Sequence, residues 1–149
     1  MGLNEYKKKR NFKETPEPSD GKKPKSSDLI YVIQKHNASH PHHDLRLEMN
    51  GVLKSWAIPK LPPKRKGLKR LAIEVEDHPL GYEKFKGEIP KGQYGAGKVD
   101  IWDSGTYSII EKSKDLIIIN INGKKLTGEY CLVRTKFQEQ ENNWIFFKK

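Results

Sequence analysis

The sequence has 149 residues, enough for one domain with its own hydrophobic core and too few for two such domains. Its 29 Lys and Arg residues outnumber its 19 Asp and Glu residues, and the formal net charge of +10 favours an anionic partner, with nucleic acid ahead of a membrane surface. A single cysteine, Cys131, excludes an intramolecular disulfide, and no apolar run approaches the length of a membrane span.

The first 27 residues differ in composition from the rest of the chain. They carry eight Lys or Arg residues against four Asp or Glu residues, and they show no sustained periodicity. This pattern predicts a basic, partly flexible N-terminal arm at 1–27, disordered over 19–27, followed by one folded domain at 28–149. Because the start has no apolar core of a signal peptide, we expect a cytoplasmic protein without membrane attachment.

From residue 29 onward the sequence predicts strand after strand and very little helix. The segments are rich in Val, Ile and aromatic residues and are bounded by Gly, Pro and Asn, and they fall at 29–36, 43–49, 52–58, 70–77, 97–103, 105–110, 115–121, 125–135 and 143–148. Asn50-Gly51 and Asn122-Gly123 predict two-residue hairpin turns, and Asp103-Ser104-Gly105 predicts another reversal. A short helical turn is expected near residues 80–85. The fold class is therefore all-β and mostly antiparallel, a compact single-domain β-barrel.

The segment 34–48 concentrates chemistry on one side of two predicted strands. Because side chains alternate along a strand, His42, Asp44 and Arg46 share one face while the leucines between them share the other. The same rule puts Gln34 and His36 on one face of the preceding strand, and a hairpin would bring His36 to His42 and Asp44. Two imidazoles and a carboxylate beside a guanidinium suit a divalent metal next to a bound anion. His40, in the turn, and His43, of the wrong parity, are not expected to be ligands.

Two later segments complete the pattern. In 71–78 alternation puts Leu71, Ile73 and Val75 on one face and Glu74, Glu76 and His78 on the other, at the end of a strand where barrel rims carry chemistry. The glycine-rich stretch 92–97 lacks a following helix, so it predicts a tight turn with positive φ rather than a phosphate-binding loop.

Several motifs now occur in a fixed order along the chain, and together they resemble a known family. They are Gln-Lys-His-x-Ala-Ser-x-x-His-x-Asp-Leu-Arg-Leu-Glu at 34–48, Gly-Val-Leu-Lys-Ser-Trp-Ala-Ile-Pro at 51–59, Val-Glu-Asp-His-Pro-Leu at 75–80, Gly-Glu-Ile-Pro-Lys-Gly-Gln-Tyr-Gly-Ala-Gly at 87–97, Trp-Asp-Ser-Gly-Thr at 102–106, and Leu-Val-Arg-Thr-Lys at 132–136 with Trp144. The chain resembles the 3′-phosphoesterase module of the bacterial end-joining DNA ligase D family over about residues 10–148. No polymerase or ligase motif is present, so the resemblance is to a stand-alone form.

The resemblance implies a compact β-barrel that heals DNA 3′ ends, first removing a terminal ribonucleoside and then the remaining 3′-phosphate to leave a 3′-hydroxyl. It implies a divalent metal, Mn²⁺ in most members with Co²⁺ or Zn²⁺ as alternatives, held by His36, His42 and Asp44. The family's catalytic and phosphate-contacting residues correspond to Arg46, His78 and Tyr82. Its residues for the terminal ribonucleoside correspond to Arg10, Glu17, Gln34 and Glu76, with Arg46 and His78 shared. Asn11 replaces a common acidic residue, which puts the ribonucleoside step in question.

The resemblance also implies partners. We expect a monomer in the prokaryotic cytoplasm, associated with the nucleoid, that acts on DNA or DNA–RNA 3′ ends of a primer-template duplex. A separate end-joining ligase and polymerase would act beside it. The arm at Lys7–Arg10 and the basic loop at 64–70 would hold backbone phosphates without reading bases, so binding should weaken with salt.

Two alternatives stay open from the residues alone. His42, Asp44 and a distant His78 could form the facial triad of a non-haem iron oxygenase. A non-catalytic nucleic-acid-binding barrel could instead use Trp56, Tyr94 and Trp102 as stacking platforms, although aromatic residues of small β proteins usually lie in the core.

Overall fold

The computed structural model describes residues 3–10, 17, 28–135 and 142–149. Within these ranges the elements are α1 (Asn4–Lys8), β1 (Leu29–Asn37), β2 (His42–Met49), β3 (Val52–Ile58), β4 (Lys69–Pro79), the 3₁₀ turn η1 (Tyr82–Lys84), β5 (Gly87–Ile89), β6 (Gly97–Lys112), β7 (Leu116–Gly123), β8 (Thr127–Arg134) and β9 (Asn143–Lys148). The predicted short turn near 80–85 is confirmed as η1. Neither of these short helical elements is long or apolar enough to cross a membrane.

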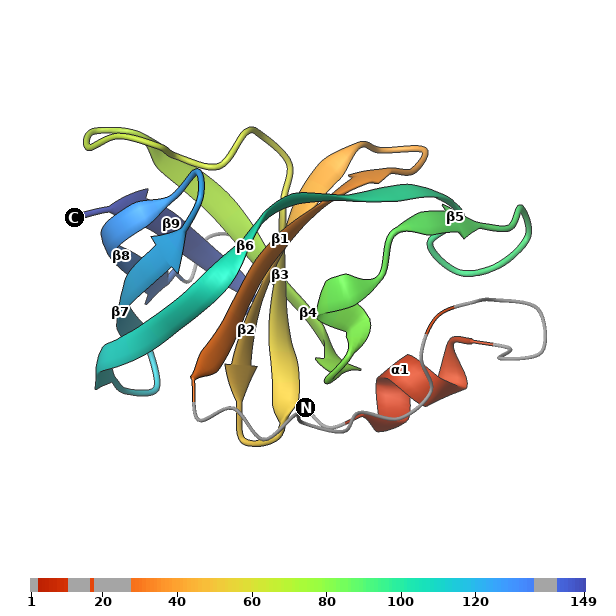
Figure 1. The fold of residues 1–149 in the computed structure, drawn as a ribbon, viewed down its shortest axis with the longest axis horizontal. Coiled ribbons are helices and arrows are strands. Elements are labelled where there is room, and N and C mark those ends of the chain that lie inside the picture. The colour runs from red at the N-terminus through yellow and green to blue at the C-terminus, as the bar shows by residue number, and fades with distance from the viewer. Residues whose placement is uncertain (1–2, 11–16, 18–27, 136–141) are drawn as a thin grey trace.

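The strands form one antiparallel sheet that closes on itself. Their order is β1-β2-β3-β4-β9-β8-β7-β6, and a second pairing of β1 with β6 closes the barrel, while β5 extends the sheet beyond β6. The predicted all-β barrel with little helix is confirmed. In Figure 1 the long strand β6 crosses the molecule from the barrel on one side to β5, η1 and α1 on the other.

The barrel interior holds the main hydrophobic core. Alternation along β2 places Leu45 and Leu47 inside with no exposed area, and the tryptophan pair Trp56 and Trp144 fills the centre with ring centroids 6.0 Å apart. At roughly 1.5–3 kcal/mol for each fully buried large side chain, this interior supplies most of the free energy that stabilises the fold. It also leaves the opposite faces of β1 and β2 pointing out of the barrel.

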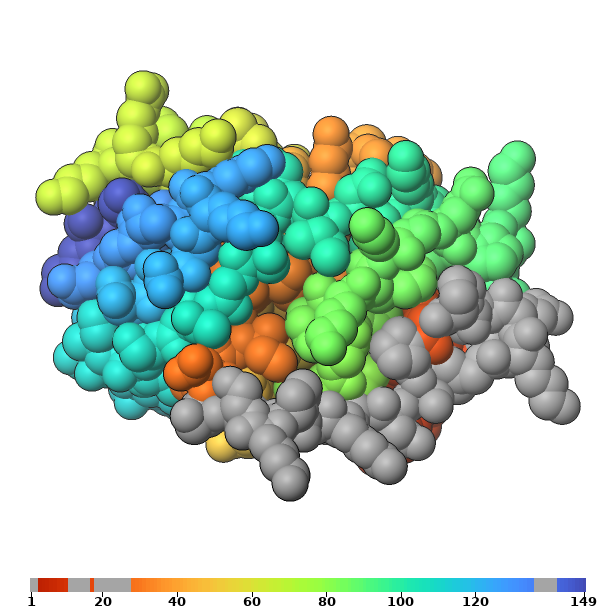
Figure 2. All heavy atoms as spheres, in the orientation of Figure 1, coloured from red at the N-terminus to blue at the C-terminus, as the bar shows by residue number. Residues whose placement is uncertain are grey.

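A second, smaller cluster covers those outer faces. Tyr6 of α1 is completely buried, and it packs with Leu53, Leu80 and Tyr82 against partly buried Ile30 and Phe85. Part of the predicted N-terminal arm therefore forms an ordered wall of the domain. In the space-filling view the green segment that contains η1 and β5 lies beside orange β1, while teal and blue β6–β8 extend away from it (Figure 2). The rest of the arm, including 19–27, lies outside the described residues.

Of the three predicted hairpin turns and reversals, two are wrong and one is confirmed, and the predicted positive φ in the glycine-rich stretch 92–97 is confirmed at Gly92, Gly95 and Gly97. Asn50 and Gly51 both have positive φ and join β2 to β3 as expected. Asp103 instead lies inside a continuous β6. Its buried carboxylate accepts hydrogen bonds from the Tyr31 hydroxyl at 2.8 Å and from the backbone N–H groups of 124–126 at 2.9–3.0 Å. The β7–β8 turn consequently falls at 124–126, and Gly123 still belongs to β7.

Candidate active site

The β1–β2 hairpin carries the His-rich motif on the outer face of the barrel. Its register places His36 opposite His42 and Gln34 opposite Asp44, which confirms the predicted hairpin. The intervening turn is only four residues long (38–41), so the two histidines meet at the end of the hairpin. The site therefore lies on the outer face of β1 and β2, outside the hydrophobic core of the barrel.

The three predicted metal ligands lie together. One ligand atom each from His36, His42 and Asp44 lies within 4.8 Å of the other two. Nδ1 of His36 is 3.7 Å from Asp44 Oδ2, and Nε2 of His42 is 3.2 Å from Asp44 Oδ1. The other nitrogen of each ring donates to a carbonyl, His36 Nε2 to Gly95 at 2.6 Å and His42 Nδ1 to His40 at 2.8 Å. Because a carbonyl can only accept, these nitrogens carry a proton, and in the neutral form of each ring the lone pair lies on the nitrogen that faces Asp44. This donor set fits a divalent ion.

The charge of Asp44 supports cation binding. Burial opposes ionisation of the carboxyl group, but the Arg46 guanidinium at 3.5 Å and the two imidazoles outweigh burial and hold the pKa of Asp44 well below its ordinary value. A hydrogen bond to the same carboxylate raises the pKa of His42. A proton and a metal ion therefore compete for Nε2 of His42.

Arg46 lies buried beside the carboxylate in a fixed orientation. Its Nε donates to Gln34 Oε1 at 2.6 Å and its Nη1 donates to the Ser55 hydroxyl at 2.8 Å. Its guanidinium carbon lies 4.9 Å from the centre of the Tyr82 ring. A guanidinium has five N–H donors, so donors remain on both terminal nitrogens for an anion in the adjacent cavity.

A bulge in β4 positions the third site segment. Between Val75 and His78 the pairing of β4 with β3 contains one extra residue on β4, which breaks the alternation along the strand. The prediction that Val75 faces away from Glu76 and His78 is therefore wrong, because all three line the same cavity. Glu74, expected beside them, instead accepts a hydrogen bond from the Trp144 indole at 3.0 Å.

His78 is a neutral imidazole with a defined tautomer. Its Nε2 lies 3.2 Å from Nη2 of Arg10, which can only donate, so Nε2 carries the lone pair. Its Nδ1–H then donates to the Glu76 carbonyl at 3.1 Å. Burial, with the positive charges of Arg46 and Arg10, lowers the pKa of His78 well below its ordinary value.

Arg10 and Glu17 join the N-terminal segment to this wall. Nε of Arg10 donates to Glu17 Oε2 at 2.8 Å, and Nη1 lies 3.4 Å from a carboxylate oxygen of Glu76. The Tyr82 hydroxyl donates to the same Glu17 oxygen at 2.7 Å. Burial raises the pKa of Tyr82 well above its ordinary value, and Glu17 raises it further. The hydroxyl expected to donate to a phosphoryl oxygen is thus engaged by a carboxylate.

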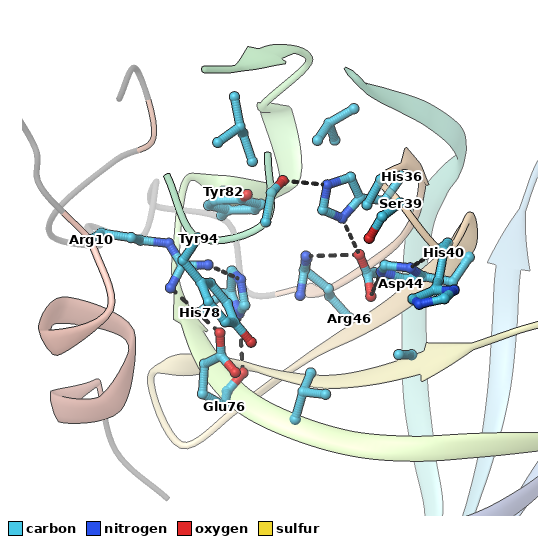
Figure 3. Close-up of a pocket in the computed structure, with 17 residues that line it drawn as sticks. Arg10, His36, Ser39, His40, Asp44, Arg46, Glu76, His78, Tyr82 and Tyr94 are labelled. Atoms are coloured by element: carbon cyan, nitrogen blue, oxygen red, sulfur yellow. Dashed lines mark hydrogen bonds and ion pairs between the residues drawn. The ribbon is translucent and has the colours of Figure 1, made fainter. Parts of the chain in front are cut away.

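These side chains surround one cavity of about 460 Å³ (Figure 3). Of the ten predicted site residues, eight line it, and two, Gln34 and Glu17, lie behind the wall and hold Arg46, Arg10 and Tyr82. The lining comprises Arg10, His36, Ala38, Ser39, His40, His42, Asp44, Arg46, Ala57, Val75, Glu76, His78, Tyr82, Ile89, Tyr94, Gly95 and Val99.

The other residues named in the sequence analysis, which were not assigned to the metal site, occupy several different positions. His43 is absent from the metal cluster of the described residues and packs edge-to-face on Trp102 with ring centroids 5.6 Å apart. His40 lines the cavity, and its backbone carbonyl orients His42. Trp56 is a core residue, as the composition of small β proteins suggests. Asn11 lies outside the described residues.

Sequence reasoning missed Ser55, Gly95 and the cavity role of Tyr94. Ser55 lies between Arg46 and His78, with its hydroxyl 3.5 Å from His78 Nδ1. Side chains alternate along the strand at 52–58, and Ser55 lies on the face that points out of the barrel. The pairing of this strand with the preceding one could therefore have identified Ser55 as a neighbour of Arg46. Gly95 contributes through its carbonyl, which carries no side-chain signal.

Comparison with known proteins matches residues 34–134 to the family model described as the DNA ligase D 3′-phosphoesterase domain. The multifunctional non-homologous end joining protein LigD of Pseudomonas aeruginosa is 45% identical over 98% of the chain. The multifunctional non-homologous end joining DNA repair protein LigD of Mycobacterium tuberculosis is 49% identical over 89% of the chain, and its counterpart protein in Mycolicibacterium smegmatis is 41% identical over 96%. The chain spans 18–20% of the length of these relatives.

Proposed function

The chain belongs to the DNA ligase D 3′-phosphoesterase domain family, and from this membership and the geometry of the cavity we propose that it is a metal-dependent enzyme that heals DNA 3′ ends. In the first step water cleaves the bond from phosphorus to O5′ of a terminal ribonucleoside, which leaves a 3′-phosphate on the strand. In the second step water releases inorganic phosphate and leaves a 3′-hydroxyl. The relatives are named as non-homologous end joining proteins, which agrees with a substrate that is a DNA end.

One observation supports this proposal above the others. The lone pairs of His36 and His42 and the carboxylate of Asp44 converge beside the buried guanidinium of Arg46 in one cavity. A divalent ion held there, Mn²⁺ in our proposal, supplies Lewis-acid polarisation of a phosphoryl oxygen and acidifies bound water. The same position offers the Arg46 N–H donors to the remaining phosphoryl oxygens. In both proposed steps a phosphate would lie between the metal ligands and the Arg46 guanidinium.

His78 suits proton transfer because its neutral Nε2 accepts a proton. Burial and the guanidinium groups of Arg46 and Arg10 lower the pKa of His78, so a proton that Nε2 takes from the attacking water makes an imidazolium that is a stronger acid than usual and passes the proton to the leaving oxygen. Gln34 and Ser55 hold Arg46, and Glu17 holds Arg10 and Tyr82, so these residues act by positioning the groups that face the cavity.

We propose that Arg10 and Glu76, which meet at 3.4 Å on one side of the cavity, contact the terminal ribonucleoside. The net charge of +10 suits a duplex end as the substrate, with the exposed basic loop 64–66 contacting backbone phosphates. A primer-template with a 3′ end entering the cavity, acted on by a monomer, is the form we propose. We also propose that a separate end-joining ligase and polymerase act on the same DNA end.

The two alternatives fit the site less well. The triad first considered for an iron oxygenase included His78, but the metal cluster of the described residues contains His36 instead. Two histidines and a carboxylate also suit iron, yet the buried Arg46 beside them favours an anionic substrate. A purely binding barrel gives no reason for two imidazole tautomers fixed toward one carboxylate.

The decisive assay uses primer-templates that end in one ribonucleotide or in a 3′-phosphate. With Mn²⁺ the first should lose its nucleoside and then its phosphate, and the second should release inorganic phosphate. EDTA and the Arg46→Ala variant should abolish both reactions, whereas His43→Ala should retain them. Tight DNA binding without either product would support the binding barrel and overturn the enzyme.

A further inference from the structure

Tyr94 is a large aromatic side chain at the edge of the active-site cavity that the reaction described above does not use. It lies in the loop between β5 and β6 and is 48% exposed, whereas Tyr82, the other tyrosine that lines the cavity, is buried. It also lines a second, more polar hollow of about 530 Å³, which shares Val75 and Glu76 with the first. Tyr94 therefore stands where the two hollows meet.

The loop fixes the ring relative to the metal ligands. Gly92 and Gly95 flank Tyr94 with φ of 88° and 75°, a left-handed conformation that other residues rarely adopt. The carbonyl of Gly95, the next residue, accepts the 2.6 Å hydrogen bond that orients His36. The same turn of backbone therefore carries Tyr94 and orients His36, and Figure 3 shows Tyr94 at the side of the cavity that Arg10, Glu76 and His78 also line.

Two cations lie near the ring of Tyr94, and one of them belongs to Arg10, which we propose contacts the terminal ribonucleoside. The ammonium group of Lys9 lies 4.6 Å from the ring centre, and the guanidinium carbon of Arg10 lies 5.4 Å from it. Lys9 also donates to the Tyr94 hydroxyl at 3.4 Å and to Glu76 at 3.3 Å. An exposed ring among polar groups, at a fixed place beside a phosphate site, is the arrangement that stacks a nucleic-acid base.

We propose that Tyr94 is the platform on which the base of the 3′-terminal nucleoside stacks while its phosphate lies at the metal ligands. This inference rests on the proposed function. It adds a residue that favours an end with a terminal nucleoside over an end with a 3′-phosphate. Stacking recognises any base, because every base has a flat face, so the site would bind a terminal nucleoside without reading its identity. Arg10 and Glu76 would meet the polar atoms of the same nucleoside.

A cycle that alters both the enzyme and the substrate tests the proposal. The substrates are primer-templates that end in adenosine, in a ribose without a base, or in a 3′-phosphate. In the wild type, loss of the base should reduce nucleoside removal about ten-fold, as expected for one stacked base. In Tyr94→Ala that dependence should disappear, and the ratio of nucleoside removal to phosphate release should fall about ten-fold. Tyr94→Phe should restore both values.

The control is Ile110→Ala, which truncates an exposed apolar side chain on β6 that does not line the cavity and should keep the wild-type dependence on the base. The proposal is overturned if Tyr94→Ala keeps the full dependence on the base, or if nucleoside removal and phosphate release decline together. If the wild type releases no nucleoside, the proposed function fails by itself. The same cycle, measured as binding affinity in EDTA by fluorescence anisotropy, then still decides whether Tyr94 stacks the base.

Discussion

Replacement of Gln34 by leucine removes the side chain that holds Arg46 without touching the cavity. Gln34 has no exposed area, and its Oε1 accepts the Arg46 Nε–H at 2.6 Å. Its amide nitrogen donates to the carbonyls of Tyr82 and Phe85 at 2.7 and 3.1 Å. Leucine has a similar size and can make none of these three hydrogen bonds.

The free energy of unfolding should fall substantially in this variant. The Tyr82 carbonyl keeps the backbone N–H of Phe85, but Arg46 Nε–H and the Phe85 carbonyl lose the partner that Gln34 supplied. Each buried group left without a partner costs about 1–3 kcal/mol, so we expect a loss of roughly 2–6 kcal/mol. The freed guanidinium should also shift, and misplacement by about 1 Å can lower a rate about 100-fold. Because both steps use Arg46, both rates should fall by the same factor.

The assay is single-turnover cleavage of a 3′-ribonucleoside end and of a 3′-phosphate end, with urea unfolding in parallel. Gln34→Glu, which keeps an acceptor for Arg46, should recover part of the activity in both steps. A selective loss of nucleoside removal, with phosphate release intact, would refute positioning of Arg46. It would favour the direct contact between Gln34 and the ribonucleoside that the family resemblance implies.

Three further predictions concern stability, pH and salt. Asp103→Ala leaves two buried donors unpaired, the Tyr31 hydroxyl and the backbone N–H of Leu126, so urea unfolding should show a loss of roughly 2–5 kcal/mol, and a loss below about 0.5 kcal/mol would contradict this. The pKa of His78 is lowered in the folded protein, so below pH about 6.5 the unfolded chain binds a proton that the folded protein does not bind. The free energy of unfolding should therefore decrease as the pH is lowered through this range. In His78→Gln the slope of the free energy of unfolding against pH should be shallower by up to about 1.4 kcal/mol per pH unit, and an unchanged slope would exclude His78 as its source. Alanine substitutions across 64–66 should reduce the salt dependence of duplex binding by roughly one log-log unit per lost phosphate contact, whereas Lys112→Ala, at the other end of β6 from the cavity, should not.

The sequence predicted the parts of the site that depend on local alternation. His36, His42 and Asp44 share a face because β1 and β2 pair without irregularity, so counting residues sufficed. The same counting failed in β4, where the bulge before His78 changes which side chains share a face. A bulge depends on the pairing partner and leaves no periodic signal in its own strand.

Long-range contacts account for the other differences. Asp103 was predicted to start a turn because Asp, Ser and Gly favour turns, but its carboxylate instead stabilises a turn at 124–126 from a neighbouring strand. Tyr6 lies in a segment without periodicity, yet it packs on His78 and Tyr82, with ring centroids 4.9 and 6.0 Å away. Deletion of the first nine residues would therefore remove part of the active-site wall as well as positive charge.

The most direct test of the account is the position of Mn²⁺ in crystals of the protein, measured by anomalous scattering at the manganese edge. We expect one strong peak bounded by His36 Nδ1, His42 Nε2 and the Asp44 carboxylate, and we expect that peak to be lost in Asp44→Ala but not in His43→Ala. A peak coordinated by His40 or His43, or one that persists in Asp44→Ala, would contradict the metal centre on which the proposed function depends.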